Sequence, residues 1–341
     1  MKFLNSLKSI DKIFLLLLLF CGLILFVNLG TRGVERWDEY TNIQVVKEST
    51  GMNLSFQSEK FFEKPPIWYW LTRFLTNILG DEIWVYRLPS ALSGSAIVTL
   101  IYQFLKKRTN KTSAFISAVS FLLIPHNILV NTSDYFSTHT YKSADLDGLQ
   151  ILLIFLSFVL LQTKRKYWIL SCILLGLGFL VKGPLVMIFL AINSLFIVSS
   201  RKFNRKELNT LFSGLITFGI IVLPWHLFMF INHGSDFTDV YLNYHIIERM
   251  NEGIEGHGHP VWYILKVFFD FRVNPLWPLL ILALFNRKIY SVQYVRYSMI
   301  AIISVLLIFT IVETKLAWYV LPVYPFMCLV LGNFFYRFRF K

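Results

Sequence analysis

Long apolar segments recur along this chain of 341 residues, and they limit the folds open to it more than any other feature. A helix of about 20 apolar residues is long enough to cross the hydrocarbon core of a bilayer. The composition agrees, because 55% of the residues are apolar and only 16% are charged, whereas soluble domains have about 25% charged residues. The segments, about ten in all, lie roughly at residues 13–30, 84–105, 113–130, 146–163, 167–181, 184–200, 208–231, 275–286, 297–313 and 316–336. We therefore expect an all-α, polytopic transmembrane helix bundle of about ten spans, forming one multi-span membrane domain over residues 1–341.

The first apolar segment lies close to the N-terminus, where a signal peptide would also lie. Because it is not followed by a small-residue cleavage site, we expect it to remain as a membrane anchor. The cysteines, Cys21, Cys172 and Cys328, each lie inside an apolar segment and form no CxxC pattern. We interpret them as small hydrophobic residues of helices rather than as disulfides or metal ligands.

The basic residues predict the orientation of the chain. Alternate connections between the segments, counted from the N-terminus, hold 20 basic residues against two acidic ones, Asp11 and Glu207. The rest of the chain holds 13 basic and 18 acidic residues. A basic excess on alternate short connections is typical of the cytoplasmic side. The 20 basic residues are Lys2, Lys8, Lys12, Lys106, Lys107, Arg108, Lys111, Lys164, Arg165, Lys166, Arg201, Lys202, Arg205, Lys206, Arg287, Lys288, Arg296, Arg337, Arg339 and Lys341.

This pattern predicts a multi-pass protein of the inner (plasma) membrane, with a cytoplasmic N-terminus and with membrane lipids around it. The net charge of +13 does not indicate a nucleic-acid partner, because the basic residues are not clustered on one soluble module. The polar residues of the opposite side lie in a first outer loop, 31–83, a second long outer loop, 232–274, and the loop 131–145. Since long ordered loops often carry function, we expect the active site on the outer (periplasmic) face.

Two adjacent carboxylates, Asp38 and Glu39, follow the first span closely. A carboxylate beside a region of low dielectric can have a raised pKa and act as a general base, or it can bind a metal. The alternative is a solvated helix start, where acidic residues stabilise the positive end of the helix dipole.

Glu63 and Lys64 precede a proline and aromatic run, Pro65-Pro66-Ile67-Trp68-Tyr69-Trp70. The prolines fix the backbone, and the aromatic residues anchor the segment at the depth of the lipid headgroups. A lysine held at that depth suits a lipid phosphate. The alternative is an ordinary interfacial lysine beside an aromatic belt.

Asp145 and Asp147 lie at the outer mouth of the fourth span, and Lys182 lies between the fifth and sixth spans. Ionisable residues at the edge of the hydrocarbon are unfavourable and are often functional. The alternatives are a capping pair at a helix start for the two acids and a snorkelling residue at a helix end for the lysine.

The second long outer loop holds His245, Arg249 and His257, and Lys315 lies at the outer end of the last span. Arginine suits bidentate phosphate recognition. The histidines, with neighbouring glutamates, could bind a metal, but they lack a standard zinc spacing, and loop histidines are more often not ligands. The cations and carboxylates of all these motifs share one face, which suits an anionic lipid headgroup beside a basic catalyst.

Taken in order, these motifs resemble those of the GT-C glycosyltransferases of the protein-mannosyltransferase and aminoarabinose-transferase type. The matching elements are the acidic pair after the first span, the Lys-Pro-Pro-aromatic box, Asp147 at the head of the fourth span, Leu180-Val181-Lys182-Gly183-Pro184, Arg249 followed by His259-Pro260-Val261-Trp262, and the run from Lys315 to Pro325. The resemblance covers about residues 30–330 and implies a GT-C-like bundle with amphipathic interfacial helices in the outer loops.

The resemblance also implies a polyprenyl-phosphate-sugar donor and a lipid, glycan or protein acceptor. By resemblance, Asp38 corresponds to the catalytic carboxylate, and Lys64 and Arg249 correspond to the contacts with the lipid phosphate. Glu63 and one histidine, His245 or His257, would contact a divalent metal, which is optional; no cofactor is required. Aminoarabinose-type members continue with further spans and a soluble C-terminal domain beyond the position that Lys341 occupies here.

These observations predict a membrane glycosyltransferase that transfers a sugar with inversion. The catalytic candidates are Asp38 first and Asp147 second, with Glu39 and Asp145 beside them. The candidates for binding the donor phosphate are Lys64, Arg249, Lys182 and Lys315. The alternative from another class is a transporter or flippase of a lipid-linked sugar, which would place charges along a path through the membrane. A non-catalytic membrane scaffold would leave the clustered acidic and basic residues unexplained.

Overall fold

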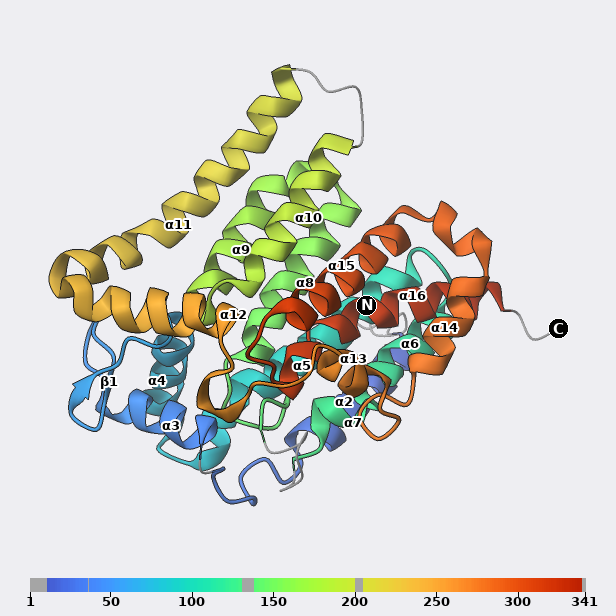
Figure 1. Ribbon diagram of the computed structural model, residues 1–341. Coiled ribbons are helices and arrows are strands. Elements are labelled where there is room, and N and C mark those ends of the chain that lie inside the picture. The colour runs from blue at the N-terminus through green and yellow to red at the C-terminus, as the bar shows by residue number, and fades with distance from the viewer. Residues whose placement is uncertain (1–10, 36, 131–137, 200–204, 339–341) are drawn as a thin grey trace, which may run out of the picture.

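The structure, a computed structural model, describes residues 11–35, 37–130, 138–199 and 205–338, and almost all of its regular structure is helical (Figure 1). The helices of the first half are α2 (Lys12–Cys21), which continues as a π-helix at Gly22–Phe26, α3 (Asp38–Glu48), α4 (Ile67–Leu79), α5 (Ile83–Lys106), α6 (Lys111–Leu122), α7 (Pro125–Ile128) and α8 (Asp147–Thr163). Those of the second half are α9 (Trp168–Lys182), α10 (Leu185–Ser199), α11 (Arg205–Phe237), a π-helix at Thr238–Glu248, α12 (Arg249–Asn251), α13 (Tyr263–Phe269), α14 (Trp277–Phe285), α15 (Gln293–Ile311) and α16 (Val323–Arg337). Short 3-10 turns lie at Arg165–Tyr167, Ile254–Gly256, Arg287–Ser291 and Ala317–Val320.

Each apolar segment predicted from the sequence contains a helix. Four helical stretches of the described chain are long and apolar enough to cross a membrane, namely Ile83–Lys106, Arg205–Asn251, Gln293–Ile311 and Ala317–Arg337. Shorter apolar helices lie at Lys12–Phe26, Lys111–Leu122, Asp147–Thr163 and Leu185–Ser199. The chain is therefore an all-α, multi-pass membrane protein, and the expected number of about ten spans stays a prediction.

Two short strands, β1 (Ser55–Phe56) and β2 (Glu59–Lys60), form an antiparallel hairpin. Its turn residues, Gln57 and Ser58, both have a positive φ, of 53° and 67°, as a two-residue type I′ turn requires. The pairing continues as a hydrogen bond from Phe61 N to Leu54 O. The hairpin thus returns the chain toward α3 just before the Glu63-Lys64 motif.

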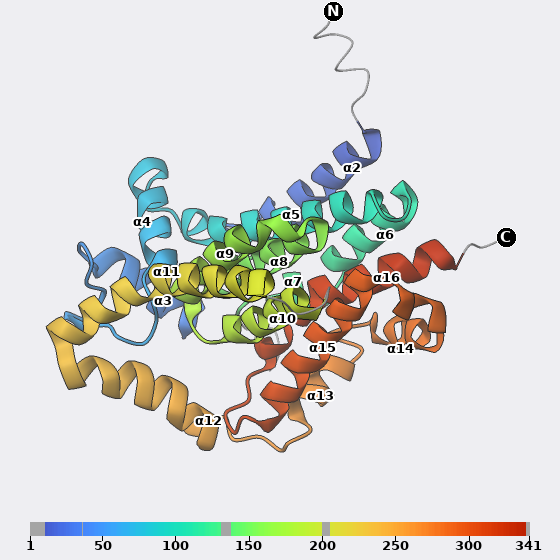
Figure 2. The same cartoon turned by 90° about the horizontal axis from the view of Figure 1, so that it is seen from above.

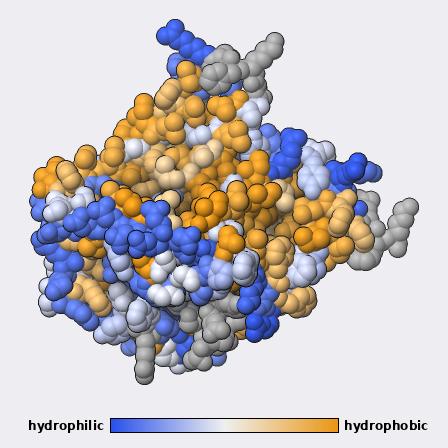
Figure 3. Space-filling model, viewed as in Figure 1, coloured by the Kyte–Doolittle hydropathy of each residue, from blue (hydrophilic) through white to orange (hydrophobic). Residues whose placement is uncertain are grey.

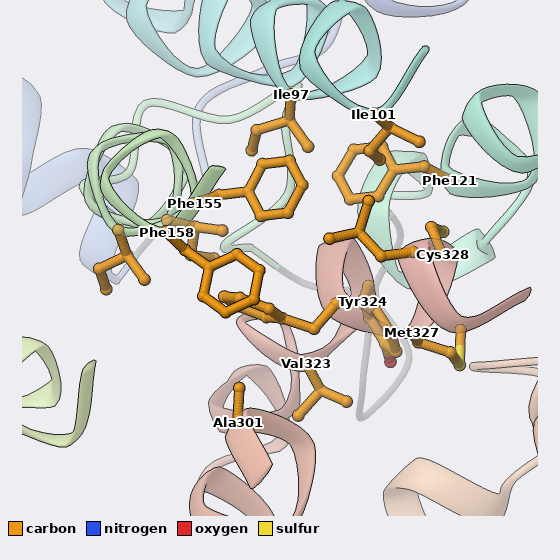
Figure 4. Close-up of a cluster of buried hydrophobic side chains, with 14 of the residues drawn as sticks. Ile97, Ile101, Phe121, Phe155, Phe158, Ala301, Val323, Tyr324, Met327 and Cys328 are labelled. Atoms are coloured by element: carbon orange, nitrogen blue, oxygen red, sulfur yellow. The ribbon is translucent and has the colours of Figure 1, made fainter. Parts of the chain in front are cut away.

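The hydrophobic core of the bundle surrounds α16, in which every residue from Val323 to Phe334 is buried. Figure 4 shows Val323, Tyr324, Met327 and Cys328 of this helix among aromatic and aliphatic side chains of α5, α6, α8 and α15. A Cβ on Gly332 would lie 2.3 Å from Cδ1 of Leu105, so any larger residue at this crossing of α16 and α5 would require the side chain of Leu105 to shift. The described cysteines are buried and free, as predicted.

One end of the bundle collects the basic connections. Asp11 forms ion pairs with Lys106 at 2.6 Å and with Lys111 at 3.5 Å, and Arg108 donates a hydrogen bond to the carbonyl of Gln162 at 3.1 Å. Connections that the charge pattern placed on one side therefore lie together in space, at what we call the basic end. Lys2, Lys8, Arg201, Lys202, Arg339 and Lys341 lie outside the described residues.

The opposite end, which we call the loop end, is formed by the two long polar segments. The long helix α11 bends at Gly234, whose φ is 52°, and the chain then doubles back toward α12 (Figures 1 and 2). This bend brings the second long segment onto the first, since Phe237 packs edge-on against Phe62 and His233 contacts Lys60 at 3.1 Å. Hydrophilic residues gather over the loop end in Figure 3, below a broad hydrophobic surface over α9, α10 and α11. The residues 131–137 of the third predicted outer loop lie outside the described residues.

Candidate active site

Two adjoining cavities open at the loop end, with volumes of about 260 Å³ and 160 Å³. The first is bounded by α3 and by the polar segments, and the second extends toward α10 and α15. The residues that line both are Glu63, Lys64, Lys182, His245, Arg249, Trp318 and Tyr319. The second cavity is also lined by Pro184, Leu185, Phe309 and Pro322. A polar chamber and a partly apolar chamber therefore meet at a set of three cations.

Asp38 begins α3 and lines the first cavity, with 21% of its side chain exposed. Its Oδ1 accepts a hydrogen bond from Lys64 Nζ at 2.8 Å, and its Oδ2 lies 3.1 Å from His139 Nε2. Burial by itself would raise the pKa of Asp38, but the charges of Lys64 and His139 hold this pKa well below its ordinary value. The expectation of a raised pKa was therefore wrong, because the burial that favours the neutral acid also brings two cations within hydrogen-bond reach.

Lys64 is placed by the chain segment between the hairpin and α4. Pro65 and Pro66 follow it directly, and Pro66 precedes the first residue of α4. Burial would lower the pKa of Lys64, but the neighbouring carboxylate of Asp38 raises it. The lysine is therefore a permanent cation whose ammonium faces both cavities.

His139 is the residue of this site that the sequence analysis missed. Its ring lies between two carboxylates, with Nδ1 2.5 Å from Asp147 Oδ2 and Nε2 3.1 Å from Asp38 Oδ2. One ring face stacks on Trp318, with 3.9 Å between the ring centroids. Burial would lower the pKa of His139, but Asp145 and Asp147 raise it to about 9. At neutral pH the imidazole is therefore charged and donates one hydrogen bond to each carboxylate.

The backbone of His139 adopts a left-handed conformation, with φ of 59°, which is uncommon for a residue with a side chain. Its N–H donates to Asp145 Oδ2 at 2.7 Å, and Thr138 Oγ1 donates to the same oxygen at 2.6 Å. Asp145 therefore holds this turn, which aims the ring at Asp38 and Asp147. A histidine eight residues before Asp147, in the same outer loop, was the one signal for it in the sequence.

Asp147 begins α8 and Lys182 ends α9, so two helix ends bring these residues together. Lys182 Nζ donates to Asp147 Oδ2 at 2.6 Å. The five side chains form a continuous row of alternating charge, which we call the cavity cluster: Lys64, Asp38, His139, Asp147 and Lys182.

Glu39 and Asp145 do not line the cavities. Glu39 is fully buried, and it accepts hydrogen bonds from Arg87 Nε at 2.7 Å, from Arg32 Nη2 at 3.0 Å and from the Ala144 N–H at 2.9 Å. The carboxylate of Asp145 accepts hydrogen bonds from Asn42, from Thr138 and from the N–H of His139. Their placement favours structural roles over the catalytic roles predicted for them.

Arg249 and Glu255 form an ion pair at the edge of the first cavity, with Arg249 Nη2 3.0 Å from both carboxylate oxygens. Arg249 Nε has no hydrogen-bond partner in the part of the chain that the structure describes. Arg249 therefore brings a positive charge to both cavities, which it lines.

Glu63 and His245 line both cavities and lie 3.8 Å apart, and His257 lines the first cavity. Burial raises the pKa of Glu63. Among residues 11–35, 37–130, 138–199 and 205–338, no group of three or more His, Cys, Asp and Glu residues is arranged to hold a metal ion. Two side chains alone do not define such a site, so the metal contact stays a prediction.

Lys315 is not with the other cations. It is buried and lines a neighbouring cavity of about 510 Å³, which we call the Lys315 cavity. Leu316, Trp318 and His257 line both this cavity and the first one. The predicted contact of Lys315 with the donor phosphate is therefore not supported by its position.

The chain is similar in sequence to known glycosyltransferases. Residues 63–227 match the family model described as dolichyl-phosphate-mannose-protein mannosyltransferase. The chain is 25% identical over 333 residues, 93% of its length, to the undecaprenyl phosphate-alpha-4-amino-4-deoxy-L-arabinose arabinosyl transferase 1 of Pseudomonas fluorescens. It is 26% identical over 325 residues, 90% of its length, to the corresponding transferase of Yersinia pestis. The chain spans 58% and 56% of the lengths of these two relatives.

The fold is similar to the crystal structure of ArnT from Cupriavidus metallidurans bound to undecaprenyl phosphate, with a TM-score of 0.77 and 18% identity. The similarity covers 95% of this chain and 60% of that one. The apo structure of the same protein gives a TM-score of 0.73. In sequence and in fold, the chain is thus similar to polyprenyl-phosphate-sugar glycosyltransferases of the GT-C type.

Proposed function

We propose that this chain transfers a sugar from a polyprenyl-phosphate donor to an acceptor, with inversion at the anomeric carbon. The observation that carries this proposal is that Lys64, Lys182 and Arg249 lie where a polar cavity joins a partly apolar one. A polyprenyl phosphate has the same division, with an anionic head and an apolar chain. Its phosphate would lie at the three cations, and the start of its chain would lie against Leu185 and Phe309.

The ion pairs of the cavity cluster suggest how the donor prepares the catalyst. Without a donor, Lys64 holds the pKa of Asp38 low, and a carboxylate with a low pKa is a weak base. A donor phosphate would compete with Asp38 for the ammonium of Lys64. As Lys64 turns to the phosphate, the pKa of Asp38 would rise, and Asp38 becomes a better base only when the donor is bound.

The transfer itself is a single displacement. The acceptor hydroxyl oxygen attacks the anomeric carbon, its proton passes to a carboxylate oxygen of Asp38, and the bond from the anomeric carbon to the phosphate oxygen breaks. Lys64 and Arg249 stabilise the departing polyprenyl phosphate. His139 orients Asp38, and Asp147 in turn holds His139 and Lys182 in place, so Asp147 acts as a positioning residue.

A divalent metal held by Glu63 with His245 or His257 would add positive charge beside the phosphate. No step of the displacement depends on it, because the phosphate is already a good leaving group and three cations face it. The acceptor would be a lipid, a glycan or a protein. The basic end would face the cytoplasm of a plasma membrane, and the cavities would open on the outer face.

The orientation can be tested with single cysteines on an otherwise cysteine-free chain. A cysteine at Ser58 or Ser235, both at the loop end, should react with an impermeant reagent added to intact cells. A cysteine at Asn110, at the basic end, should react only after the cells are opened. Labelling of Asn110→Cys in intact cells would place the basic end outside and the cavities on the cytoplasmic face.

The donor site can be tested by binding of undecaprenyl phosphate to the purified protein in nanodiscs. Lys64→Met should weaken this binding at least about tenfold, because a hydrogen bond between charged groups is lost. Lys60→Met is the matched control, since Lys60 lies on the same segment but outside both cavities, and it should bind as the wild type does. Equal binding of undecaprenyl phosphate by all three proteins would show that Lys64 does not bind the donor phosphate. Leaflet-to-leaflet movement of the lipid without sugar transfer would favour the flippase.

A further inference from the structure

A separate cavity opens at the basic end of the bundle, opposite the cavity cluster, and has a volume of about 640 Å³. We call it the basic-end groove. Helices α6 and α14 both pack against α16, which lies between them in Figure 2, and the groove is lined by these three helices and the residues at their ends. None of its lining residues takes part in the proposed transfer, so a ligand bound here would serve another role.

The deeper part of the groove is apolar. Ile116 lies six residues after Asn110 along α6, which places it about 9 Å further from the basic end. On the opposite wall, Leu282 and Phe285 of α14 are 55% and 80% exposed. A large apolar area therefore faces outward from the groove. An acyl chain that enters from the membrane surface is suited to such a wall.

The mouth of the groove is polar and favours an anion. Its polar residues are Asn110, Thr112, Ser113 and Asn286. Asn110 Oδ1 accepts a hydrogen bond from Ser113 N at 2.8 Å, and Asn286 Oδ1 accepts one from Lys288 N at 3.2 Å. Because these oxygens are engaged, the Nδ2 groups are the parts of both amides that can donate to a ligand. Helix α6 also begins here without an acidic residue in its first turn, and the positive end of a helix dipole attracts a phosphate.

The chain segments that form this mouth carry four cations, each one or two positions from a lining residue: Lys111, Arg287, Lys288 and Arg337. Arg287 and Lys288 are exposed and form no ion pair within the part of the chain that the structure describes. Asp11 lies 3.5 Å from Lys111 but closer to Lys106, at 2.6 Å. A net positive charge therefore remains at the mouth, as in basic pockets between transmembrane helices that bind anionic lipid headgroups.

We propose that the basic-end groove binds a two-chain anionic phospholipid of the adjacent leaflet, with its phosphate at the mouth and an acyl chain against Ile116 and Phe285. A zwitterionic phospholipid fits less well, because its ammonium would face Arg287 and Lys288. The cations proposed for the donor phosphate lie at the loop end, so the two lipids would occupy separate sites. The bound phospholipid would join α6 to α14 across α16, and this inference does not depend on the proposed function.

Native mass spectrometry of the purified full-length chain tests the proposal, after incubation with an equal mixture of phosphatidylglycerol and phosphatidylcholine that carry the same acyl chains. The wild type should retain phosphatidylglycerol in at least about tenfold excess, because each cation near an anionic headgroup contributes about fivefold. A wild type that retains both phospholipids equally would overturn the site. A wild type that retains neither and appears as a dimer would make the groove an interface between two copies of the chain instead.

The double variant Arg287→Gln with Lys288→Gln should lose most of this preference. The matched control is Lys164→Gln with Lys166→Gln, which removes two exposed cations from another connection of the basic end and should keep the preference. If both double variants lose the preference equally, the anionic lipid is attracted to the basic end in general, and the groove is not its site.

A second pair of variants tests the apolar part of the groove. Ile116→Trp should fill the groove and lower the retention of phosphatidylglycerol, whereas Ile216→Trp, at an exposed position of α11 outside the groove, should not. Lys64→Met should retain phosphatidylglycerol as the wild type does. Retention by Ile116→Trp at the wild-type level would overturn the groove as the binding site, and loss of retention by Lys64→Met would place the anionic phospholipid in the cavities of the loop end.

Discussion

Two adjacent residues of α3, Asp38 and Glu39, enter two different charge clusters. Asp38 belongs to the cavity cluster, where each carboxylate oxygen has one partner and the side chain is partly exposed. Glu39 belongs to what we call the sealed cluster, Arg32, Glu39 and Arg87, in which Arg87 also donates to three backbone carbonyls. Both carboxylates are paired with cations, so pairing alone does not identify a site. Access to a cavity and spare hydrogen-bonding capacity distinguish the two clusters.

The largest effect should come from Asp38→Asn. If Asp38 is the base, transfer of labelled sugar from a synthetic polyprenyl-phosphate donor should fall by about 10²–10⁴-fold, the usual contribution of a general base. Binding of undecaprenyl phosphate should persist or strengthen, because Lys64 no longer shares its charge with a carboxylate. Normal transfer by this variant would remove Asp38 from the mechanism and make Asp147 the next candidate.

The sealed cluster should respond in stability rather than in chemistry. Arg87→Met leaves the carboxylate of Glu39 buried without its main partner, which should lower the free energy of unfolding by about 3–5 kcal/mol. The measurement is the unfolding midpoint of the purified protein in detergent. The matched control is the double variant Glu39→Leu with Arg87→Met, which should recover part of this loss because no unpaired charge remains. A single variant as stable as the wild type would show that the cluster does not hold α3 to α5.

Glu39→Gln sharpens the same comparison with a smaller change. The amide keeps the shape and some hydrogen bonds of Glu39, so the free energy of unfolding should fall by only about 1–3 kcal/mol. Transfer per folded molecule should stay at the wild-type level, in contrast to Asp38→Asn. A loss of transfer equal to that of Asp38→Asn, with normal stability, would place Glu39 in the chemistry after all.

The pH dependence of transfer should show the smallest effect. The folded protein raises the pKa of His139 from 6.5 to about 9, so His139 is charged at neutral pH and loses its charge as the pH rises through 9. Transfer should therefore fall by about half at pH 9 relative to neutral pH. His139→Gln should remove this alkaline limb. If transfer by the wild type stays constant up to pH 10, the charge of His139 does not contribute to the reaction.

The sequence predicted the helices and the main members of the cavity cluster for one reason: both follow from local pattern. Asp38, Asp147 and Lys182 each lie at a helix end, and Lys64 is held by two prolines, so their positions in the sequence place them at the loop end of the bundle. His139 could not be predicted in this way, because its left-handed backbone and its contact with Asp38 arise only when α3 and the turn at 138–145 pack together. The sequence also predicts that Lys315 lies on the outer face. In the structure, Leu316 and Trp318 lie between Lys315 and the first cavity, and Lys315 lines the Lys315 cavity instead.

The burial of α16 bears on how the protein is made. Helices enter the membrane in the order of synthesis, and α16 is the last helix that the structure describes, yet it fills the middle of the core. Until residues 323–337 have been synthesised, the earlier helices leave the faces around Ile97, Phe121 and Phe155 without their partner. Nascent chains at that stage would be the natural targets of membrane chaperones and proteases, and substitutions at Gly332 should lower the yield of the protein more than its activity.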